Sequence, residues 1–322
     1  MKLPLRFPRT ARAGLLAVAL AVCGAPAHAG PSLSPAIAKA FEPPERSAEC
    51  FDIAHAHDKP EAWLCRINPS SRTAPSFVLF GDSHALQLLG AFDAAARQAG
   101  RSGVFTGYSG CVPLLGVYPL TRPDQAVRNC AALNLRMLDH VGRSGIKDVF
   151  LVAKWSYYTD MWQGTSYLNA IGLAPGEEVS VRNSRRAFEQ GVLDTVKAYR
   201  ALGVRLHIVP QVPQQMLAPE QAYTRAMLEQ DGAAARLRAL SVPRARHAQL
   251  QAFAGSVFAR AVGGDAVRIM NFDDLFCDAE VCLIGTPAAS YYQDPSHLSG
   301  DGAARLVPAL ARALSAKGPT SR

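Results

Sequence analysis

The sequence FVLFGDSHALQLL, residues 77–89, has four apolar residues, then Gly81-Asp82-Ser83-His84, and then a helical pattern. Such a segment predicts a buried strand that turns directly into a helix. Gly, Asp and Ser are ordinary residues of turns and helix N-caps, so a plain turn explains them. The same residues also suit a nucleophile at the tip of a strand, with a helix N-terminus beneath it. The segment alone leaves both interpretations open.

Beta-like runs alternate with helical patterns from residue 77 onward. The expected strands are 77–80, 103–107, 147–153, 204–210 and 266–272. The expected helices are 84–100, 124–143, 184–202, 219–240 and 243–262, with a last helix from an N-cap at Ser299 to about residue 316. This alternation predicts an α/β protein, a three-layer α/β/α sandwich with a mostly parallel, flavodoxin-like five-stranded sheet.

The first 29 residues have the layout of a secretory signal peptide. Four basic residues and no acid precede an apolar stretch too short to span a membrane, and Ala27-His28-Ala29 supplies a small-residue cleavage site. A lipoprotein signal that uses Cys23 is the alternative, although Val22 is bulky for that motif. We expect export across the inner membrane to the periplasm as a soluble protein. An N-terminal extension at 30–75, a main domain at 76–316 and a tail at 317–322 complete the predicted organisation.

Charge and cysteine content narrow the function classes. The chain carries a net charge of +8, which falls to +4 without the four basic residues of the leader. No basic run with interleaved aromatic residues occurs, so nothing indicates a nucleic-acid partner. An even number of cysteines remains after the leader, and in an exported chain this indicates disulfides. The simplest pairing joins sequence neighbours: Cys50–Cys65, Cys111–Cys130 and Cys277–Cys282.

A zinc site is the alternative use of these cysteines. No C-x-x-C motif occurs, and the histidines are not spaced against the cysteines as ligand pairs. His55, His57 and Asp58 lie close together in the extension but have no further ligand set beside them. We therefore expect no metal and no cofactor.

A second motif, YYQDPSHLSGDGA at 291–303, precedes the last expected helix. A serine nucleophile needs a base within hydrogen-bond reach, and that imidazole needs an acceptor on its other nitrogen. Asp294 and His297 can present these two groups from one short turn. The alternative is a plain turn with a solvated histidine. Because parallel strands end at one edge of a sheet, we expect both residues to meet Ser83, and the two motifs together favour catalysis.

The GDSH and DPSHLS motifs resemble the SGNH/GDSL hydrolase superfamily. Other segments resemble the SGNH domains associated with acyltransferase-3 (AT3) membrane proteins: Ser109-Gly110-Cys111-Val112-Pro113, the strand end Leu151-Val152-Ala153-Lys154-Trp155, and the cysteine pair before D-x-x-H-L-S. The resemblance covers about residues 75–316 and implies the SGNH hydrolase fold. It implies that Ser83 is the nucleophile, His297 the general base and acid, and Asp294 the orienting carboxylate. It also implies an oxyanion hole made by the N–H groups of Ser83 and the Gly110 region.

The segment AKWSYY departs from the wider superfamily, which has an asparagine after the third strand. This chain has none until Asn169, and Trp155 stands in that neighbourhood, as in the AT3-associated branch. Trp155, Tyr157 and Tyr158, with Trp162 nearby, form an aromatic cluster that suits sugar rings or acyl chains. Plain packing under a loop is the alternative. Asp82 is expected to bond local backbone N–H groups.

The resemblance, with the expected export, implies a serine O-acetyltransferase that modifies a cell-envelope polysaccharide through an acyl-enzyme. Its partners would be that carbohydrate, an acyl donor and an AT3 membrane protein that delivers the acyl group. The first alternative is a carbohydrate acetylesterase or a GDSL lipase-esterase. An alternative of another class is a non-catalytic envelope protein that binds glycans.

Overall fold

A computed structural model describes residues 33–43, 50–52, 63–160, 169–228, 232–263 and 266–316, all within one compact unit, Leu33–Arg322. The expected signal peptide and C-terminal tail lie outside the described residues. So do His55, His57, Asp58 and Trp162. None of the described helices is both long and apolar enough to cross a membrane.

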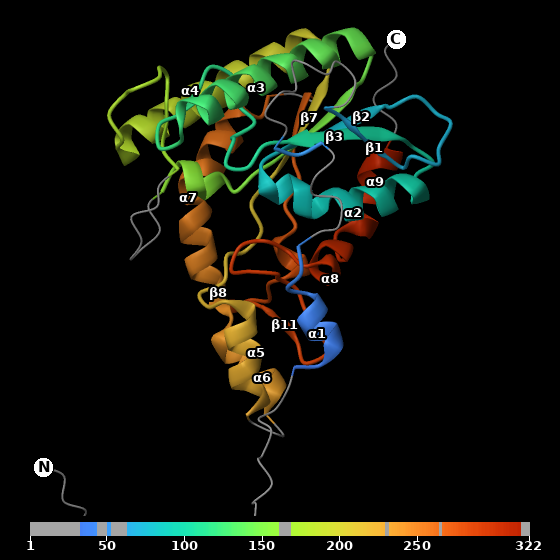
Figure 1. The fold of residues 1–322 in the computed structure, drawn as a ribbon, viewed down its shortest axis with the longest axis vertical. Coiled ribbons are helices and arrows are strands. Elements are labelled where there is room, and N and C mark those ends of the chain that lie inside the picture. The colour runs from blue at the N-terminus through green and yellow to red at the C-terminus, as the bar shows by residue number, and fades with distance from the viewer. Residues whose placement is uncertain are drawn as a thin grey trace, which may run out of the picture. The chain divides into compact units, whose positions relative to one another are not determined.

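A six-stranded sheet forms the centre of the fold (Figure 1), in the order β1-β3-β2-β5-β7-β9. Its strands are β1 (Cys65–Ile67), β2 (Phe77–Gly81), β3 (Gly103–Gly107), β5 (Asp148–Val152), β7 (Arg205–Val209) and β9 (Val267–Ile269). β1 is antiparallel to β3, and all other neighbours are parallel. The mostly parallel sheet is confirmed, and its five parallel strands have the flavodoxin-like order. The expected number of five strands is wrong, because the three residues of β1 add an edge strand too short to show any periodicity.

Helices cover both faces of this sheet, which confirms the three-layer sandwich. Phe77, Leu79 and Phe150 point into one core with α2 (Ser83–Gln98), α8 (Gly300–Ala304) and α9 (Val307–Ser315). Val78, Phe80 and Leu151 point into the other core with α3 (Asp124–Ser144), α4 (Val181–Ala201) and α7 (Arg244–Ala261). Alternate residues of one strand therefore serve opposite cores, as expected for strands buried on both faces.

Two of the expected helices are each divided in two. The pattern at 219–240 forms α5 (Pro219–Met227) and α6 (Ala233–Leu240), with Gly232 at the N-cap of α6. The last helix divides into α8 and α9, with proline in the first turn of α9. Proline has no N–H for an i−4 hydrogen bond, so the first piece ends before it.

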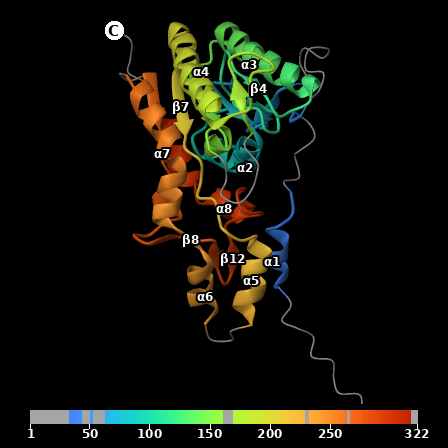
Figure 2. The ribbon, with the colours of Figure 1, turned by 90° about the vertical axis from the view of Figure 1, so that its left-hand side faces the viewer.

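Short elements gather beyond the carboxyl ends of the strands (Figure 2), where α5, α6, β8, β12 and α1 (Pro35–Lys39) lie below the sheet. The described residues also form three two-stranded antiparallel ribbons. These are β4 (Tyr118–Pro119) with β6 (Ile171–Gly172), β8 (Val242–Pro243) with β10 (Val281–Cys282), and β11 (Gly285–Thr286) with β12 (Ala289–Ser290). Two 3₁₀ turns are η1 (Trp155–Tyr158) and η3 (Asp273–Leu275).

Three disulfides staple these segments, in the pairs expected from sequence proximity. Cys50–Cys65 fastens the segment before Phe51 to β1, Cys111–Cys130 joins the loop after β3 to α3, and Cys277–Cys282 closes the turn before β10. The second of these pairs holds a loop that borders the candidate site.

A buried ionic network lies at the amino end of β5, opposite the edge that carries the motifs. Asp148 is 2% exposed and accepts hydrogen bonds from Arg205 and His207 (2.8 Å each) and from Arg101 (3.0 Å). Burial opposes ionisation of this carboxyl group. The hydrogen bonds and charges of His207 and Arg205 outweigh burial and hold the pKa of Asp148 well below its ordinary value.

We expect Asp148→Asn to lower the free energy of unfolding by about 3–5 kcal/mol at neutral pH, because it leaves buried charges without their partner. The pKa of Asp148 is depressed in the folded state, so its stabilisation is complete above the unfolded-state pKa of about 3.9 and is lost as the pH falls through the folded value. Urea unfolding across this acidic range should therefore show a weaker pH dependence in the variant than in the wild type. Asp139→Asn removes an exposed pair with Arg143 and is the control, expected to cost less than ~1 kcal/mol. Equal losses in the two variants would contradict the prediction.

Candidate active site

Ser83 is the first residue of α2, and Asp82 is its N-cap. The sharp turn from β2 requires glycine at position 81, because a Cβ there would lie 1.7 Å from the carbonyl oxygen of Val152. Ser83 is half-buried at the carboxyl end of β2, and its backbone N–H belongs to the first turn of α2. N–H groups of a first helical turn have no partner within the helix, so they can bind a developing negative charge.

The structure brings Ser83, His297 and Asp294 into one hydrogen-bonded chain. Ser83 Oγ lies 2.7 Å from His297 Nε2, although the two residues are 214 positions apart in the sequence. His297 Nδ1 lies 2.6 Å from Asp294 Oδ2. The other oxygen of Asp294 accepts the backbone N–H groups of Ser296 and His297, each at 2.8 Å, so the turn itself fixes the carboxylate. This is the arrangement in which a base can take a proton from a serine hydroxyl.

The charge states of Asp294 and His84 suit this arrangement. Burial opposes ionisation of Asp294, but the hydrogen bond and charge of His297 outweigh it and hold the pKa of Asp294 well below its ordinary value. Burial, and then the charge of His297, lower the pKa of His84 well below its ordinary value. The His84 ring lies 4.6 Å from the His297 ring. A neutral His84 next to His297 avoids repulsion when His297 becomes an imidazolium.

Asp82 joins three chain segments next to Ser83. Its Oδ1 accepts the N–H of His84 at 2.9 Å. Its Oδ2 accepts the N–H of Lys154 at 3.0 Å and the hydroxyl of Tyr158 at 2.8 Å. Burial raises the pKa of Asp82, while these three hydrogen bonds lower it. The expectation that Asp82 bonds local backbone N–H groups is confirmed, and the Tyr158 hydroxyl is a further donor.

The aromatic residues after β5 do not share one surface. Trp155 has no exposed area, and its indole N–H donates to the carbonyl of Val209 at 2.7 Å. Tyr158 is equally buried. Substrate contact was expected for both and is wrong, because η1 turns their side chains into the core. Tyr157 is half-buried, with its ring centroid 5.2 Å from the Lys154 ammonium, and substrate contact at Tyr157 stays a prediction.

The loop after β3 brings Gly110 to the same edge of the sheet. The N–H of Tyr108 donates to the carbonyl of Gly81 at 3.2 Å, and the N–H of Cys111 donates back to Tyr108 at 3.0 Å. Gly110 has φ +63°, a left-handed conformation that favours glycine. Asn169 Nδ2 donates to the Gly110 carbonyl at 2.7 Å. The sequence did not link Asn169 to this loop, because it lies far along the chain from β3. An oxyanion role for Gly110 stays a prediction.

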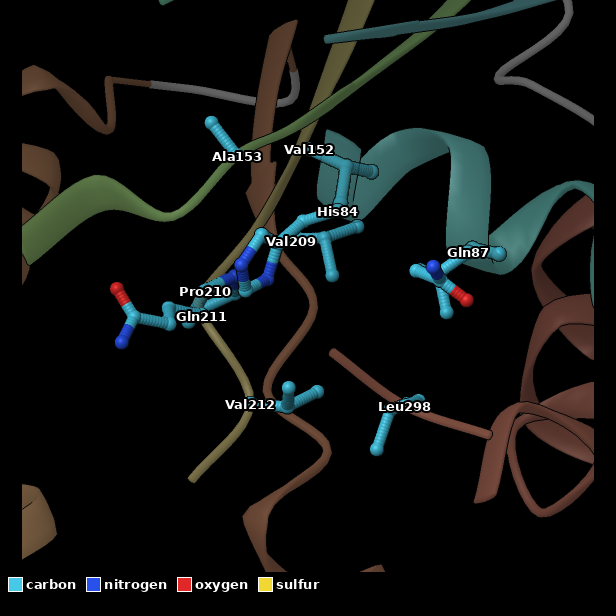
Figure 3. Close-up of a pocket in the computed structure, with 10 residues that line it drawn as sticks. His84, Gln87, Val152, Ala153, Val209, Pro210, Gln211, Val212 and Leu298 are labelled. Atoms are coloured by element: carbon cyan, nitrogen blue, oxygen red, sulfur yellow. The ribbon is translucent and has the colours of Figure 1, made fainter. Parts of the chain in front are cut away.

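A small apolar cavity, lined in part by His84, lies at the carboxyl ends of β5 and β7 (Figure 3). Its volume of about 10 Å³ is enough for one water-sized group. His84 lines the cavity, and its buried Nε2 has no hydrogen-bond partner among the described residues. The cavity is lined mainly by His84, Gln87, Val152, Val209, Pro210 and Leu298.

We expect Tyr158→Phe to destabilise the fold by about 1–3 kcal/mol, because the buried Asp82 carboxyl group loses one of its donors. Thermal or urea unfolding measures this loss. Tyr199→Phe is the matched control: Tyr199 is also buried, and its hydroxyl makes no hydrogen bond within the part of the chain that the structure describes. If the two variants lost the same stability, the anchoring role of Tyr158 would be refuted.

The chain was compared with known families, sequences and structures. A search of the curated proteins finds no match. The periplasmic domain of a lipopolysaccharide acetyltransferase from Salmonella ser. Paratyphi A is similar in fold, with a TM-score of 0.59 and 14% identity over 84% of this chain and 92% of that chain. An acylhydrolase described from Bacteroides fragilis has a TM-score of 0.40 and 13% identity, over 76% of this chain and 91% of that one. A GDSL-like lipase from Bacteroides thetaiotaomicron has a TM-score of 0.40 and 12% identity, over 74% and 86%.

The profile of the family described as "SGNH domain (fused to AT3 domains)" matches residues 49–312. This range holds the sheet, the Ser83 turn and the loop with Asp294 and His297. The match covers far more than half of the chain, so the protein belongs to the SGNH domain family that is found fused to AT3 domains.

Proposed function

We propose that this SGNH-type acyl-transfer enzyme is an exported serine O-acetyltransferase that modifies a cell-envelope polysaccharide. One observation supports the proposal above all: a chain of the AT3-associated SGNH family has an unbroken hydrogen-bonded path from Asp294 through His297 to Ser83. A serine, a base that takes its proton and a carboxylate that orients the base are the groups that covalent acyl transfer through a serine ester requires.

In the first half-reaction, Ser83 Oγ attacks the acyl carbon of the donor while His297 Nε2 takes the hydroxyl proton. Asp294 stabilises the resulting imidazolium through Nδ1–H. The oxyanion rests on the N–H groups of Ser83 and Gly110. The tetrahedral intermediate then expels the leaving group, which takes the proton from His297, and an acyl-serine ester remains.

In the second half-reaction, His297 removes a proton from the hydroxyl of the acceptor, whose oxygen attacks the acyl-serine carbon. The new ester leaves, and the proton returns from His297 to Ser83 Oγ. A sugar hydroxyl as acceptor gives an O-acetylated glycan, whereas water gives hydrolysis.

Transfer to a glycan is favoured over hydrolysis by the family, whose SGNH domains occur fused to AT3 domains. The similar fold from Salmonella is described as the periplasmic domain of a lipopolysaccharide acetyltransferase. We therefore propose that an AT3 membrane protein supplies the acyl group and that the chain works in the periplasm. The signal-like first 29 residues and three disulfides support an oxidising location.

Acetylester hydrolysis is the second candidate function. The side chains of His297 and Asp294 are 22% and 45% exposed, so solvent reaches the base side of the site. Water can then compete with a sugar hydroxyl for the acyl-enzyme.

Ser83 should be the residue that a fluorophosphonate probe labels, because His297 makes its hydroxyl nucleophilic. We expect wild-type protein to be labelled and Ser83→Ala to lose all labelling. His297→Ala should slow labelling by ~10³-fold or more, as removal of a general base does in other triads. Gel fluorescence and peptide mass spectrometry give the rate and the site. Ser70→Ala removes an exposed hydroxyl and is the control. Equal labelling of Ser83→Ala and wild type would rule out the serine mechanism.

The acyl-enzyme should partition between water and a sugar hydroxyl. We expect that para-nitrophenyl acetate acetylates Ser83 quickly and that an added acceptor glycan speeds deacylation in proportion to its concentration. Acetyl groups should then appear on the glycan by mass spectrometry. Fast turnover to acetate, with no acetylated product from any glycan and no effect of glycan on the rate, would assign the protein to the esterases instead.

A further inference from the structure

Two cationic side chains lie beside segments near Ser83: the Lys154 ammonium beside the Tyr157 ring, and the Arg122 guanidinium beside the Gly110 turn. We propose that they form a subsite for an anionic group of the substrate, a carboxylate or a phosphate that lies close to the transferred acyl group. This inference rests on the proposed function, since it names the charge of the molecule on which Ser83 acts.

Lys154 lies two residues after the end of β5, at the edge of the sheet that carries Ser83. Its backbone N–H is fixed on Asp82, the residue before Ser83. The side chain is half-buried, with the ammonium over the Tyr157 ring. No carboxylate of the described residues forms an ion pair with this ammonium. Burial removes hydrating water from a charged group, so a half-buried ammonium without a direct counter-ion is suited to receive an anion.

Arg122 stands over the Gly110 turn. Its guanidinium donates to the carbonyl of Ser109 at 3.0 Å. The guanidinium carbon lies 3.5 Å from the point where a Cβ on Gly110 would be. Arg122 is half-buried, and it too forms no ion pair with a carboxylate in the described ranges. A guanidinium has five N–H donors, so this one contact with the main chain leaves donors for a ligand.

Asn169 holds the two cation-bearing segments next to each other. Its side-chain amide donates to the Gly110 carbonyl at 2.7 Å, and its backbone N–H donates to the carbonyl of Tyr157 at 3.0 Å. Its side-chain oxygen accepts the hydroxyl of Thr121, the neighbour of Arg122, at 3.1 Å. The Arg122 segment, the Gly110 turn and the Lys154–Tyr157 segment therefore form one hydrogen-bonded frame.

The acidic groups around this frame already have other partners. Each of their carboxylates accepts hydrogen bonds or pairs with an arginine outside the frame; these residues are Asp52, Asp82, Asp160 and Asp294. Burial lowers the pKa of Lys154, while the charges of Asp294 and Asp82 raise it. These two carboxylates act on the ammonium only through space, and an anion in contact with it would stabilise the charged form further.

The chemistry of Lys154 and Arg122 indicates the class of ligand that the subsite binds. A guanidinium fork and an ammonium on segments joined through Asn169 both bind the oxygens of a carboxylate or a phosphate, and the Tyr157 ring offers an apolar face to the group that carries them. The anion can belong to the acceptor, as in an acidic or phosphorylated sugar, or to the acyl donor, as in an acyl phosphate.

Two esters that differ by one charge test the subsite: para-acetoxybenzoate and its methyl ester. We expect wild-type protein to prefer the anionic ester in kcat/KM, and the ratio of the two values to fall about tenfold in Lys154→Met and in Arg122→Met. The double variant should lose the preference altogether. Lys154→Arg, which keeps the charge, should retain most of it. A ratio that does not change in any of the variants would overturn the proposal.

Lys197→Met is the matched control, because it removes the same charge from an exposed position near the C-terminal end of α4, at the opposite edge of the sheet. It should leave the ratio of the two esters unchanged. An equal fall in this control would mean that the preference comes from the net charge of the protein and would also overturn the subsite.

Two further arms separate the sources of the anion. If the donor carries the anion, the rate of Ser83 acetylation by acetyl phosphate, divided by the rate with para-nitrophenyl acetate, should be higher in the wild type than in Lys154→Met. If the acceptor carries it, oligogalacturonate should speed deacylation of the wild type more than neutral xylo-oligosaccharide does.

A binding measurement keeps this test independent of the proposed function. Calorimetric titration of Ser83→Ala with oligogalacturonate or with inorganic phosphate should detect binding that the additional change Lys154→Met weakens about tenfold. If no ester is cleaved and no probe labels Ser83, the acyl-transfer function fails while this binding still supports the subsite. If Ser83 is labelled but neither binding nor the ester ratio depends on Lys154 or Arg122, the subsite alone fails.

Discussion

The candidate site depends on the hydrogen bonds that the buried carboxyl group of Asp82 accepts. It accepts N–H groups from the start of α2 and from the end of β5, and the hydroxyl of Tyr158 in η1. Through the first contact it sets the direction in which Ser83 leaves the strand. Through the other two it fixes the segment that carries Lys154 and Tyr157. One side chain thus holds both Ser83 and the Lys154–Tyr157 segment in place, and each of its hydrogen bonds offsets the cost of burying the carboxyl group.

The pKa values of two carboxyl groups near Ser83 are shifted in opposite directions. Burial raises the pKa of Asp82, which suits an internal anchor. The hydrogen bond and charge of His297 lower the pKa of Asp294 despite burial, which suits a permanent counter-charge for an imidazolium. His84, kept neutral by burial and by the charge of His297, fills the space beside that ring without competing for its charge.

The sequence was sufficient for those parts of the fold and site that follow from local rules. The apolar run before Gly81 and the D-x-x-H turn before the last helix each had a clear local pattern, and the shared edge of a parallel sheet brought them together. Edge strand β1 was missed, because three residues carry no periodicity and their pairing with β3 is long-range. The burial of Trp155 and Tyr158 was missed because a single 3₁₀ turn decides where those side chains point. Asn169 was missed because it reaches the Gly110 turn from 59 positions further along the chain. Arg122 was missed because it lies in the irregular connection between β3 and α3, where no periodic pattern predicts side-chain direction.

The long sequence distance between Ser83 and His297 has a consequence for the life of the chain before it is folded. A polypeptide made from its N-terminus contains Ser83 early, but gains His297, the hydrogen-bond partner of Ser83, only when nearly the whole chain is complete. Until the loop before α8 docks against α2, the Ser83 hydroxyl is chemically ordinary, no more reactive than any other serine. Under the proposed function, an incomplete chain therefore lacks acyl-transfer activity, and this delay follows from the order of the two segments in the chain alone.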